Sequence, residues 1–352
     1  MKSKFLIVGG AGFVGSSLCQ YLLEESDPKE IVIVDNLLSS DISNVPVDTR
    51  VRFIFGSIAD DRTLAQLPDD LEVVFHLACY HGNQSSIADP LADHANNTLT
   101  SLKLFEHIHR LPKLRKVVYA AAGCAVAEKT FDDAEATSED APVSLFHDSP
   151  YSISKLIGEM YGNYYWGRYG LPFVKARFQN VYGPGEILGA GRWRGTVNTV
   201  WRNVIPTFIW KSLHGEALPL DNGGMAGRDF IFVEDMARGL VACAKHGNPG
   251  EAYNLASGVE TSIGELANMI NEQTGNTTPV DLRPARDWDR SGRRFGSTQK
   301  SAEQLGFSAA VGIEEGLRQT IRWTMENRQN IQRIIANHNI LMRQHAEALV
   351  SA

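Results

Sequence analysis

The sequence predicts an α/β fold: a Rossmann-type, doubly wound parallel sheet that carries a smaller, discontinuous C-terminal lobe. A short apolar run at residues 5–8 breaks into glycines at positions 9, 12 and 15. Apolar segments of strand length then alternate with periodic segments of helix length through the first half of the chain. Because this alternation is typical of parallel sheets covered by helices on both faces, we expect that architecture here.

The expected elements follow from this alternation in chain order. Apolar runs predict strands at Phe5–Val8, Ile31–Asp35, Val51–Phe55, Val73–Leu77, Lys116–Ala120 and Phe173–Arg177. Helical periodicity predicts helices at Val14–Glu25, Thr98–His109 and Ser152–Tyr169. Two later runs, Arg228–Val233 and Ala252–Leu255, are expected to rejoin the sheet, with a helix at Glu234–His246 between them and further helix over residues 312–348.

Composition limits the classes of function. The 352 residues are 43% hydrophobic and 21% charged, and a formal net charge of −7 gives no electrostatic reason to expect nucleic acid or an anionic membrane as a partner. The four cysteines (Cys19, Cys79, Cys124 and Cys243) lack zinc-ligand spacing, so we expect no metal site and a reducing, cytoplasmic environment. The apolar run at residues 5–8 is too short for a signal peptide or a membrane span.

The glycine turn predicts a phosphate site. Gly9 permits the tight turn, Gly12 lets the backbone approach a pyrophosphate, and Gly15 allows the following helix to lie close to the strand. Free N–H groups and the dipole at the start of that helix favour bound phosphates. Glycine patterns recur by chance, so it is the strand–turn–helix context that makes this one informative.

Asp35, in the sequence Val34-Asp35-Asn36, ends the second predicted strand. A carboxylate at this place accepts hydrogen bonds from adenosine ribose hydroxyls and repels a 2′-phosphate, so it favours NAD over NADP. The alternative is an ordinary turn residue at the surface. The apolar run that precedes Asp35 favours the ribose role.

Tyr151 and Lys155, in Tyr151-Ser-Ile-Ser-Lys155, are the main candidate catalytic residues. Residues four apart lie on one face of a helix. A lysine ammonium placed there favours the tyrosinate, lowers the pKa of the tyrosine toward working pH and can also bind ribose hydroxyls. Two surface residues of an amphipathic helix show the same spacing, but the glycine turn and Asp35 in the same chain favour catalysis.

These motifs resemble those of the extended short-chain dehydrogenase/reductases that act on nucleotide sugars. The resemblance runs from Gly9 to about Gly306. It rests on Gly9-Gly-Ala-Gly12-Phe-Val-Gly15, Val34-Asp35-Asn36, Phe75-His76-Leu77-Ala78, Asn96-Asn97-Thr98, Tyr151-Ser-Ile-Ser-Lys155, Arg177-Phe-Gln-Asn180-Val-Tyr-Gly-Pro184, Arg228-Asp-Phe-Ile-Phe-Val-Glu-Asp235 and Tyr253-Asn254-Leu255-Ala256. Within the family, the chain is most similar to UDP-galactose 4-epimerases and to the sugar epimerase/dehydratases of bacterial O-antigen gene clusters, including the Bordetella Wbm type.

The resemblance implies a domain organisation and a set of site residues. An NAD-binding Rossmann domain is expected at residues 1–181 and about 229–255, a nucleotide-sugar-binding lobe at 182–228 and 256–330, and a C-terminal helical tail at 331–352. The implied NAD contacts are Gly9, Gly12, Phe13, Val14, Gly15, Asp35, Asn36, Ser57, Ile58, Leu77, Ala78, Asn97, Ala120, Tyr151, Lys155 and Phe178. The implied substrate contacts are Asn180, Asn203 and Arg228 at the phosphates, Leu218 and Leu220 along the base, and Arg286 and Asp289 around the nucleoside.

The activity that the resemblance implies is an NAD-dependent 4-epimerase with a UDP-sugar as the expected substrate, acting in cell-surface polysaccharide or lipopolysaccharide synthesis. Tyr151, as phenolate, takes the proton of the sugar 4-hydroxyl while the C4 hydride passes to NAD⁺. The 4-keto sugar then turns over and receives the hydride on its other face. The alternatives are a related dehydratase, decarboxylase or C3/C5 epimerase that uses the same pair, and a non-catalytic NAD-binding protein.

The chain departs from the family pattern after the fifth predicted strand. Family members normally carry a Ser or Thr there to hydrogen-bond the reacting hydroxyl, whereas this chain has Ala122-Gly123-Cys124. Cys124 is the nearest side chain with a donor, although a weak one, and is therefore a candidate catalytic residue; the alternative is a small buried hydrophobe. The Asp-Glu pair that 4,6-dehydratases place after the catalytic Thr is missing, which favours epimerisation.

Arg192 and Arg194 lie in a glycine-rich loop that opens the smaller lobe. Their guanidinium groups are candidates for binding an extra negative charge on the sugar, such as a uronate carboxylate, with Arg192 placed among the expected substrate contacts. The sequence leaves two other roles open, which are holding the pyrophosphate and capping the loop.

The resemblance also implies a homodimer. Its interface is expected to be a four-helix bundle formed by Thr98–His109 and the Tyr151–Lys155 helix of each subunit, although periodicity does not distinguish that face from core packing. The tail segment Arg318–Arg343 is expected either to pack on the body or to join subunits.

Overall fold

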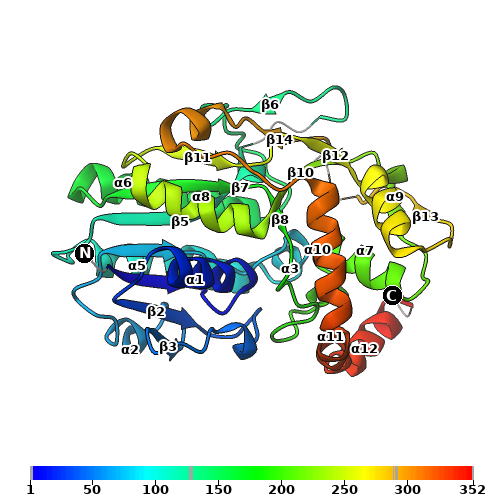
Figure 1. The fold of residues 1–352 in the computed structure, drawn as a ribbon, viewed down its shortest axis with the longest axis horizontal. Helices are drawn as coiled ribbons and strands as arrows, with labels where there is room; N and C mark the ends of the chain where they lie inside the picture. Colours follow the sequence, from blue (N-terminus) through cyan, green and yellow to red (C-terminus); the bar gives the residue numbers. More distant parts are fainter. Residues whose placement is uncertain (1–2, 127–129, 288, 290–291, 351–352) are drawn as a thin grey trace.

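The structure is a computed structural model that describes residues 3–126, 130–287, 289 and 292–350, except for the side chains of Cys124 and of residues 348–350. Its centre is a seven-stranded sheet with the order β11-β7-β5-β4-β1-β2-β3 (Figure 1). Every neighbouring pair in it is parallel. The strands are β1 (Lys4–Val8), β2 (Glu30–Asp35), β3 (Val51–Phe55), β4 (Val73–His76), β5 (Lys116–Ala122), β7 (Phe173–Phe178) and β11 (Ala252–Leu255).

The prediction of a doubly wound parallel sheet is confirmed. Strand order reverses between β1 and β4, since the chain goes from β1 outward through β2 and β3 and then returns to the other side of β1. In open α/β sheets, ligands bind beyond the carboxyl ends of the strands at such a switch point. The glycine turn follows β1 and residues 77–82 follow β4, so both lie at this crevice.

Helices cover both faces of the sheet. One face carries α1 (Phe13–Glu25) and α8 (Val233–His246), and the other carries α5 (Leu99–Ile108) and α6 (Pro150–Tyr169) (Figure 1). In β1, Phe5 and Ile7 pack into the core beneath α1 and α8, while Leu6 and Val8 pack into the core beneath α5 and α6. Alternate residues of a strand point to opposite faces, which explains why the residues from Phe5 to Val8 of β1 are all apolar.

Helix α6 packs against β5 and β7 through two glycines. A Cβ atom at Gly158 would lie 2.1 Å from the Tyr119 Oη of β5, and one at Gly162 would lie 2.0 Å from Phe173 Cζ of β7. The two glycines therefore allow the close approach. Since Tyr151 and Lys155 occupy the first turns of α6, this packing sets their height above the end of β5.

The smaller lobe is built from discontinuous segments. Its sheets are β8 (Asn180–Tyr182) with β10 (Gly227–Phe232) and β12 (Glu260–Ser262), β9 (Pro219–Asp221) with β13 (Asp281–Arg283), and β6 (Ala136–Thr137) with β14 (Phe295–Gly296). Helices α7 (Val204–Leu213), α9 (Ile263–Thr274) and α10 (Ile313–Glu326) pack on them. The short helices of the chain are η1 (Ile42–Asn44), α2 (Asp61–Leu64), α3 (Asn83–Ala88), α4 (Pro90–Asp93), the π-helix η2 (His94–Thr98), η3 (Gly123–Ala125), η4 (Val197–Thr199), η5 (Asn222–Gly224) and the π-helix η6 (Ser301–Leu305).

Of the two later strands expected to rejoin the main sheet, β11 does so and β10 does not. β11 pairs with β7, whereas β10 pairs in parallel with β8 and antiparallel with β12. The reason lies in its aromatic residues. Phe230 and Phe232 pack with Tyr182 in the core of the smaller lobe, which holds β10 there.

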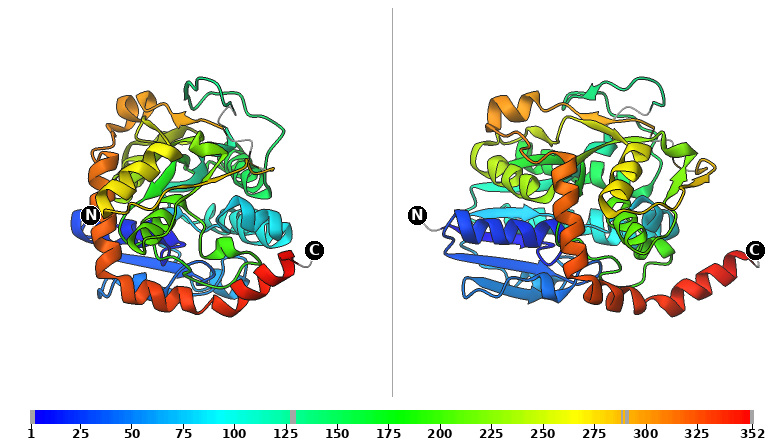
Figure 2. Two further views of the ribbon diagram at one scale, coloured as in Figure 1. Left: turned by 90° about the vertical axis from the view of Figure 1, so that its right-hand side faces the viewer. Right: turned by 45° about the vertical axis from the view of Figure 1, so that its right-hand side comes forward.

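The C-terminal segment predicted as helix over 312–348 forms three helices, α10, α11 (Arg328–Ala336) and α12 (Asn339–Val350). They descend along the smaller lobe and turn across the bottom of the molecule (Figure 2). Ile331 and Ile334 of α11 pack on the loop residues Ile187 and Leu188, so this part of the tail packs on the body. Within the described residues, no helix combines the length and apolarity that crossing a membrane requires.

Candidate active site

A single cavity of about 770 Å³ lies between the carboxyl ends of the main-sheet strands and the smaller lobe. It extends from the glycine turn to β13 and contains most of the residues singled out from the sequence. The predicted residues that line it are Gly9, Gly12, Phe13, Val14, Gly15, Asp35, Asn36, Ser57, Ile58, Leu77, Ala78, Ala120, Tyr151, Lys155, Phe178, Asn180, Asn203, Arg228, Arg286 and Asp289. The predicted residues outside this lining are Asn97, Arg192, Leu218 and Leu220.

The glycine turn closes one end of the cavity. Gly9 has a φ of +86°, and a Cβ atom there would lie 2.6 Å from the Ala78 backbone nitrogen. A Cβ atom at Gly15 would lie 2.3 Å from the Gly9 carbonyl oxygen. The helix α1 begins after Gly12 without a side-chain cap, so its first N–H groups face the cavity as a site for an anion.

Asp35 lies at the end of β2 with its carboxylate in the same cavity. The carboxylate accepts hydrogen bonds from Ala11 N (3.1 Å), Leu37 N (2.8 Å) and Ser40 Oγ (2.9 Å). Burial raises the pKa of Asp35, and these donors oppose that rise. The protein thus fixes the orientation of the carboxylate and leaves it beside the adenosine end of the predicted NAD site.

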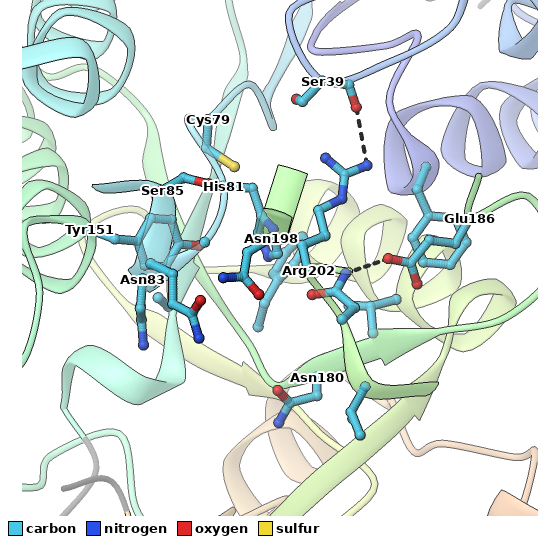
Figure 3. A pocket seen from close by; sticks show the side chains of 18 of the residues that line it. Ser39, Cys79, His81, Asn83, Ser85, Tyr151, Asn180, Glu186, Asn198 and Arg202 are labelled. Carbon is cyan, nitrogen blue, oxygen red and sulfur yellow. Dashed lines mark hydrogen bonds between the residues drawn. The ribbon is translucent and has the colours of Figure 1, made fainter. Parts of the chain in front are cut away.

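Tyr151 and Lys155 line the same cavity, and Figure 3 shows the Tyr151 side chain close to His81. Lys155 is 3% exposed; its Nζ donates to the Ala120 carbonyl oxygen (2.8 Å) and lies 5.9 Å from the centre of the Tyr151 ring. The Tyr151 backbone N–H donates to Ser86 Oγ (3.1 Å), which fixes the start of α6 against α3. Lys155 is therefore buried and Tyr151 is half-buried, and both are held in place rather than exposed on an amphipathic helix.

His81 is a cavity residue that the sequence did not single out. Its ring meets the Tyr151 ring edge to face with centres 5.9 Å apart (Figure 3). Burial, followed by the charges of Arg202, Arg194 and Lys155, lowers the pKa of His81 to about 3. The ring is therefore neutral at physiological pH and can donate or accept one hydrogen bond next to Tyr151.

The smaller lobe supplies cations and amides at the other end. Asn180 donates to the Asp229 carbonyl oxygen (3.1 Å), and the Asn203 amide is hydrogen-bonded to the buried Glu186. Arg228 lies 4.0 Å from Asp289, and Arg286 forms a 2.5 Å ion pair with Asp221. The two guanidinium groups and two amides all line the cavity, and groups of these kinds are suited to binding a diphosphate.

Leu218 and Leu220 were expected along the base, but both side chains point into the core of the smaller lobe, with exposures of 0% and 5%. Residues alternate between the two faces of a strand. In β9 it is accordingly the neighbours, Pro219 and Asp221, that line the cavity.

Asn97 was expected to contact NAD, and it is instead a buried structural link. Its amide accepts from the Tyr80 N–H (2.6 Å) and donates to Asp93 Oδ1 (2.7 Å) and Ser154 Oγ (3.1 Å). These bonds tie the loop after β4 to η2 and α6. This loop also carries His81, so Asn97 fixes the position of the His81 loop without lining the cavity itself.

The three arginines between β8 and α7 have different surroundings. Arg192 is exposed, and Arg194 is buried, with Nη1 donating to the His81 carbonyl oxygen (2.7 Å) and the guanidinium over the Tyr80 ring. Burial lowers the pKa of Arg194 to about 10. Arg202 is the one of the three that lines the cavity, with Nη2 donating to the Ser39 carbonyl oxygen (3.2 Å; Figure 3). Arg194 therefore braces the His81 loop.

The end of β5 carries no hydroxyl, as the sequence indicated. Ala120, Ala121 and Ala122 line the cavity there, and Gly123 begins the short helix η3. The side chain of Cys124, the remaining candidate catalytic residue, lies outside the described part of the structure. Among the described residues, no group of His, Cys, Asp and Glu side chains is arranged to hold a metal ion.

Comparison with known proteins identifies a matching family and several similar proteins. The model of the NAD-dependent epimerase/dehydratase family matches residues 5–256. The crystal structure of the Bordetella bronchiseptica enzyme WbmF in complex with NAD⁺ and UDP has 56% sequence identity and a TM-score of 0.87, and the match covers 97% of this chain and 98% of that one.

Two more distant relatives extend the similarity. The structure of the epimerase Mth375 from Methanothermobacter thermautotrophicus has 37% identity and a TM-score of 0.85, with 94% of this chain and 95% of that chain covered. The UDP-glucose 4-epimerase of Mycolicibacterium smegmatis is 31% identical over 327 residues, which are 90% of this chain and 97% of the relative. In each case nearly the whole of both chains is matched.

Proposed function

This chain belongs to the NAD-dependent epimerase/dehydratase family, and we propose that it is an NAD-dependent nucleotide-sugar 4-epimerase with a UDP-sugar as substrate. The observation that carries the proposal is the shared cavity. The glycine turn and Asp35, the Tyr151–Lys155 pair, and Arg228 of the smaller lobe all line this one cavity. The NAD⁺ and UDP bound by WbmF, and the reaction named for the mycobacterial relative, support the same assignment.

The residues present fit NAD. The open N–H groups of α1 suit the pyrophosphate, and Asp35 suits an unphosphorylated ribose. Bound there, NAD supplies reversible hydride acceptance, taking the C4 hydride of the sugar with its electron pair and returning it to the opposite face. Because hydride leaves and returns within one turnover, the reaction inverts C4 without net oxidation.

The proton chemistry is assigned to the Tyr151–Lys155 pair. Tyr151 Oη, as phenolate, takes the proton from the sugar 4-hydroxyl when hydride leaves C4, and gives it back when hydride returns. Lys155, anchored on the Ala120 carbonyl oxygen, holds positive charge near the phenolate and favours that form. We further propose that Asn180, Asn203 and Arg228 bind the substrate phosphates, and that residues 1–181 with about 229–255 hold the cofactor while 182–228 and 256–330 hold the sugar nucleotide.

Epimerisation is preferred to dehydration on one observation. Elimination across C5 and C6 needs a carboxyl group close to the reactive pair. The three residues that follow β5 are Gly123, Cys124 and Ala125, none of which carries one. Among the described residues, the acidic ones that line the cavity are Asp35, Glu186, Asp221 and Asp289, which come from β2 and from the segments that follow β8.

The test is a panel of UDP-, dTDP-, GDP- and CDP-sugars, including hexuronates, with products followed by NMR. We expect inversion at C4 of a UDP-sugar. A lasting 4-keto-6-deoxy product would assign a dehydratase instead, release of CO₂ a decarboxylase, and inversion at C3 or C5 the corresponding epimerase. Binding of NAD with no turnover of any sugar would leave the non-catalytic interpretation.

Asp35 gives a prediction about cofactor choice. Replacing Asp35 with Asn keeps the side-chain acceptor and removes the charge that repels a 2′-phosphate, so the preference for NAD⁺ over NADP⁺ should fall by at least about tenfold. The measurement is the dissociation constant of each cofactor by calorimetry. Asp69→Asn, an exposed carboxylate outside the cavity, should leave the ratio unchanged. An unchanged ratio in Asp35→Asn would remove Asp35 as the determinant.

We also propose a cytoplasmic homodimer that acts in O-antigen or other cell-surface polysaccharide synthesis. Apolar side chains are exposed on α5 and α6 at Leu99, Ile153, Met160 and Tyr164, which is the kind of surface that dimers bury. Met160→Glu with Tyr164→Glu should convert the dimer to a monomer in light scattering. Val47→Glu, an exposed apolar residue before β3, is the control; a wild-type monomer would contradict the proposal.

A further inference from the structure

The end of β5 lacks a polar side chain where the proposed reaction needs one. Ala120, Ala121 and Ala122 line the cavity, and Ala120 also carries the carbonyl that anchors Lys155. A hydroxyl that becomes a carbonyl passes through a state with partial negative charge on oxygen, and a fixed donor near that oxygen lowers the barrier. Among the described side chains, a donor for that oxygen has to come from a neighbouring element.

Gln179 is the residue placed to supply it. It follows β7, the strand that pairs with β5, at a register that sets Phe178 opposite Ala122. A Cβ atom at Gly123 would lie 2.4 Å from Gln179 Nε2 and 2.9 Å from its Cδ. The Gln179 amide thus fills the space that any side chain at position 123 would need.

A second glycine, Gly296, also leaves room for the Gln179 amide. A Cβ atom at Gly296 would lie 2.9 Å from Gln179 Nε2. The amide is therefore held between two residues without side chains, Gly123 after β5 and Gly296 at the end of β14. Gln179 lines the cavity, and among the described residues no protein group is hydrogen-bonded to its side-chain amide. Its N–H donors are accordingly open to a ligand.

We propose that Gln179 is a catalytic residue whose side-chain amide donates a hydrogen bond to the oxygen on the reacting carbon of the substrate. The proposal rests on the proposed 4-epimerase function and assigns to Gln179 the place of the Ser or Thr hydroxyl expected after β5. An amide N–H does not give up its proton at neutral pH. The proton of the 4-hydroxyl therefore goes directly to Tyr151, the hydride with its electron pair goes to NAD⁺, and Gln179 stabilises the oxygen between the two transfers.

The first test is Gln179→Met, which keeps the length of the side chain and removes both N–H donors. We expect kcat to fall by about 10²-fold, as for loss of one oxyanion donor, with KM, the affinity for UDP and the bound NAD content unchanged. Gln66→Met, an exposed glutamine outside the cavity, should match the wild type. Wild-type kcat in Gln179→Met would overturn the proposal, as would a loss that appears in KM alone.

The second test replaces the Gln179 amide by a serine hydroxyl at position 123. Gly123→Ser alone should be impaired, because its side chain collides with the amide. Gly123→Ser combined with Gln179→Ala places a hydroxyl in the vacated space and should be at least about tenfold more active than Gln179→Ala. Thermal unfolding checks that both variants are folded. If the folded double variant were no more active than Gln179→Ala, the proposal that a hydroxyl at position 123 and the Gln179 amide serve the same oxygen would be contradicted. A wild type that turns over no sugar would instead refute the proposed function.

Discussion

Replacing Tyr151 with Phe is expected to lower kcat for epimerisation by about 10³-fold, or about 4 kcal/mol of transition-state free energy. The phenolic oxygen is the group proposed to take and return the proton of the 4-hydroxyl, and phenylalanine keeps the ring that packs against His81. The loss should therefore appear in kcat, while NAD content and UDP affinity stay at wild-type values. Steady-state kinetics with the identified sugar and quantification of released cofactor measure both.

Tyr161→Phe is the matched control for this variant. Tyr161 lies on the same helix α6 and packs partly buried against the core beneath it, outside the cavity lining. Its replacement should leave kcat unchanged. If Tyr151→Phe kept more than about a tenth of wild-type kcat, proton transfer by Tyr151 would have to be abandoned.

The second large effect is expected in stability, at the buried ion pair between Arg177 and Glu159. Arg177 of β7 donates to both carboxylate oxygens of Glu159 of α6, at 3.0 Å and 2.9 Å, and to the Glu139 carbonyl oxygen (2.6 Å). Both side chains are below 10% exposed. Arg177→Met leaves the Glu159 charge buried without its partner, so we expect a loss of about 3–5 kcal/mol in the free energy of unfolding.

The double variant Arg177→Met/Glu159→Leu separates charge from packing. Removing both partners leaves no unpaired buried charge, and replacement of a whole buried ion pair by apolar residues is often close to neutral. We expect it to recover at least half of the stability that the single variant loses, measured by urea unfolding. A double variant as unstable as Arg177→Met would show that packing, and not the uncompensated charge, dominates at this site.

Local patterns explain what was predictable from the sequence. The turn at Gly9–Gly15 is encoded within a few residues, because the strand, the glycines and the helix start follow one another directly. Tyr151 and Lys155 are likewise one helical turn apart, so their shared face needs no knowledge of the rest of the fold. Most residues of the main-sheet strands are apolar, as in β1 (Lys4–Val8) and β2 (Glu30–Asp35), and these strands therefore stand out in the sequence.

The residues that were missed depend on contacts between distant segments. His81 reaches Tyr151 because Asn97 and Arg194 hold its loop, and neither contact leaves a periodic signal. Gln179 reaches the end of β5 because Gly123 and Gly296 leave room for it. The absence of a hydroxyl at Ala122-Gly123 was the one available signal, since it indicated that some other group must serve the reacting oxygen.

The placement of Leu218 and Leu220 failed for a different reason. A resemblance to a family locates a strand in the sequence but not which of its faces meets the ligand, and a shift by one residue exchanges the two faces. Leu218, just before β9, and Leu220 within it belong to the core, whereas Asp221 lines the cavity and pairs with Arg286. The same strand therefore serves both roles with alternate residues.

The most direct test of the central claim follows the hydrogen at C4. The UDP-sugar identified as substrate is prepared with deuterium at C4 and turned over in ordinary water, and the product is analysed by NMR. Hydride transfer to and from a retained NAD predicts an inverted product that keeps its deuterium at C4, with no net NADH formed. Replacement of that deuterium by solvent hydrogen would contradict the proposed hydride mechanism.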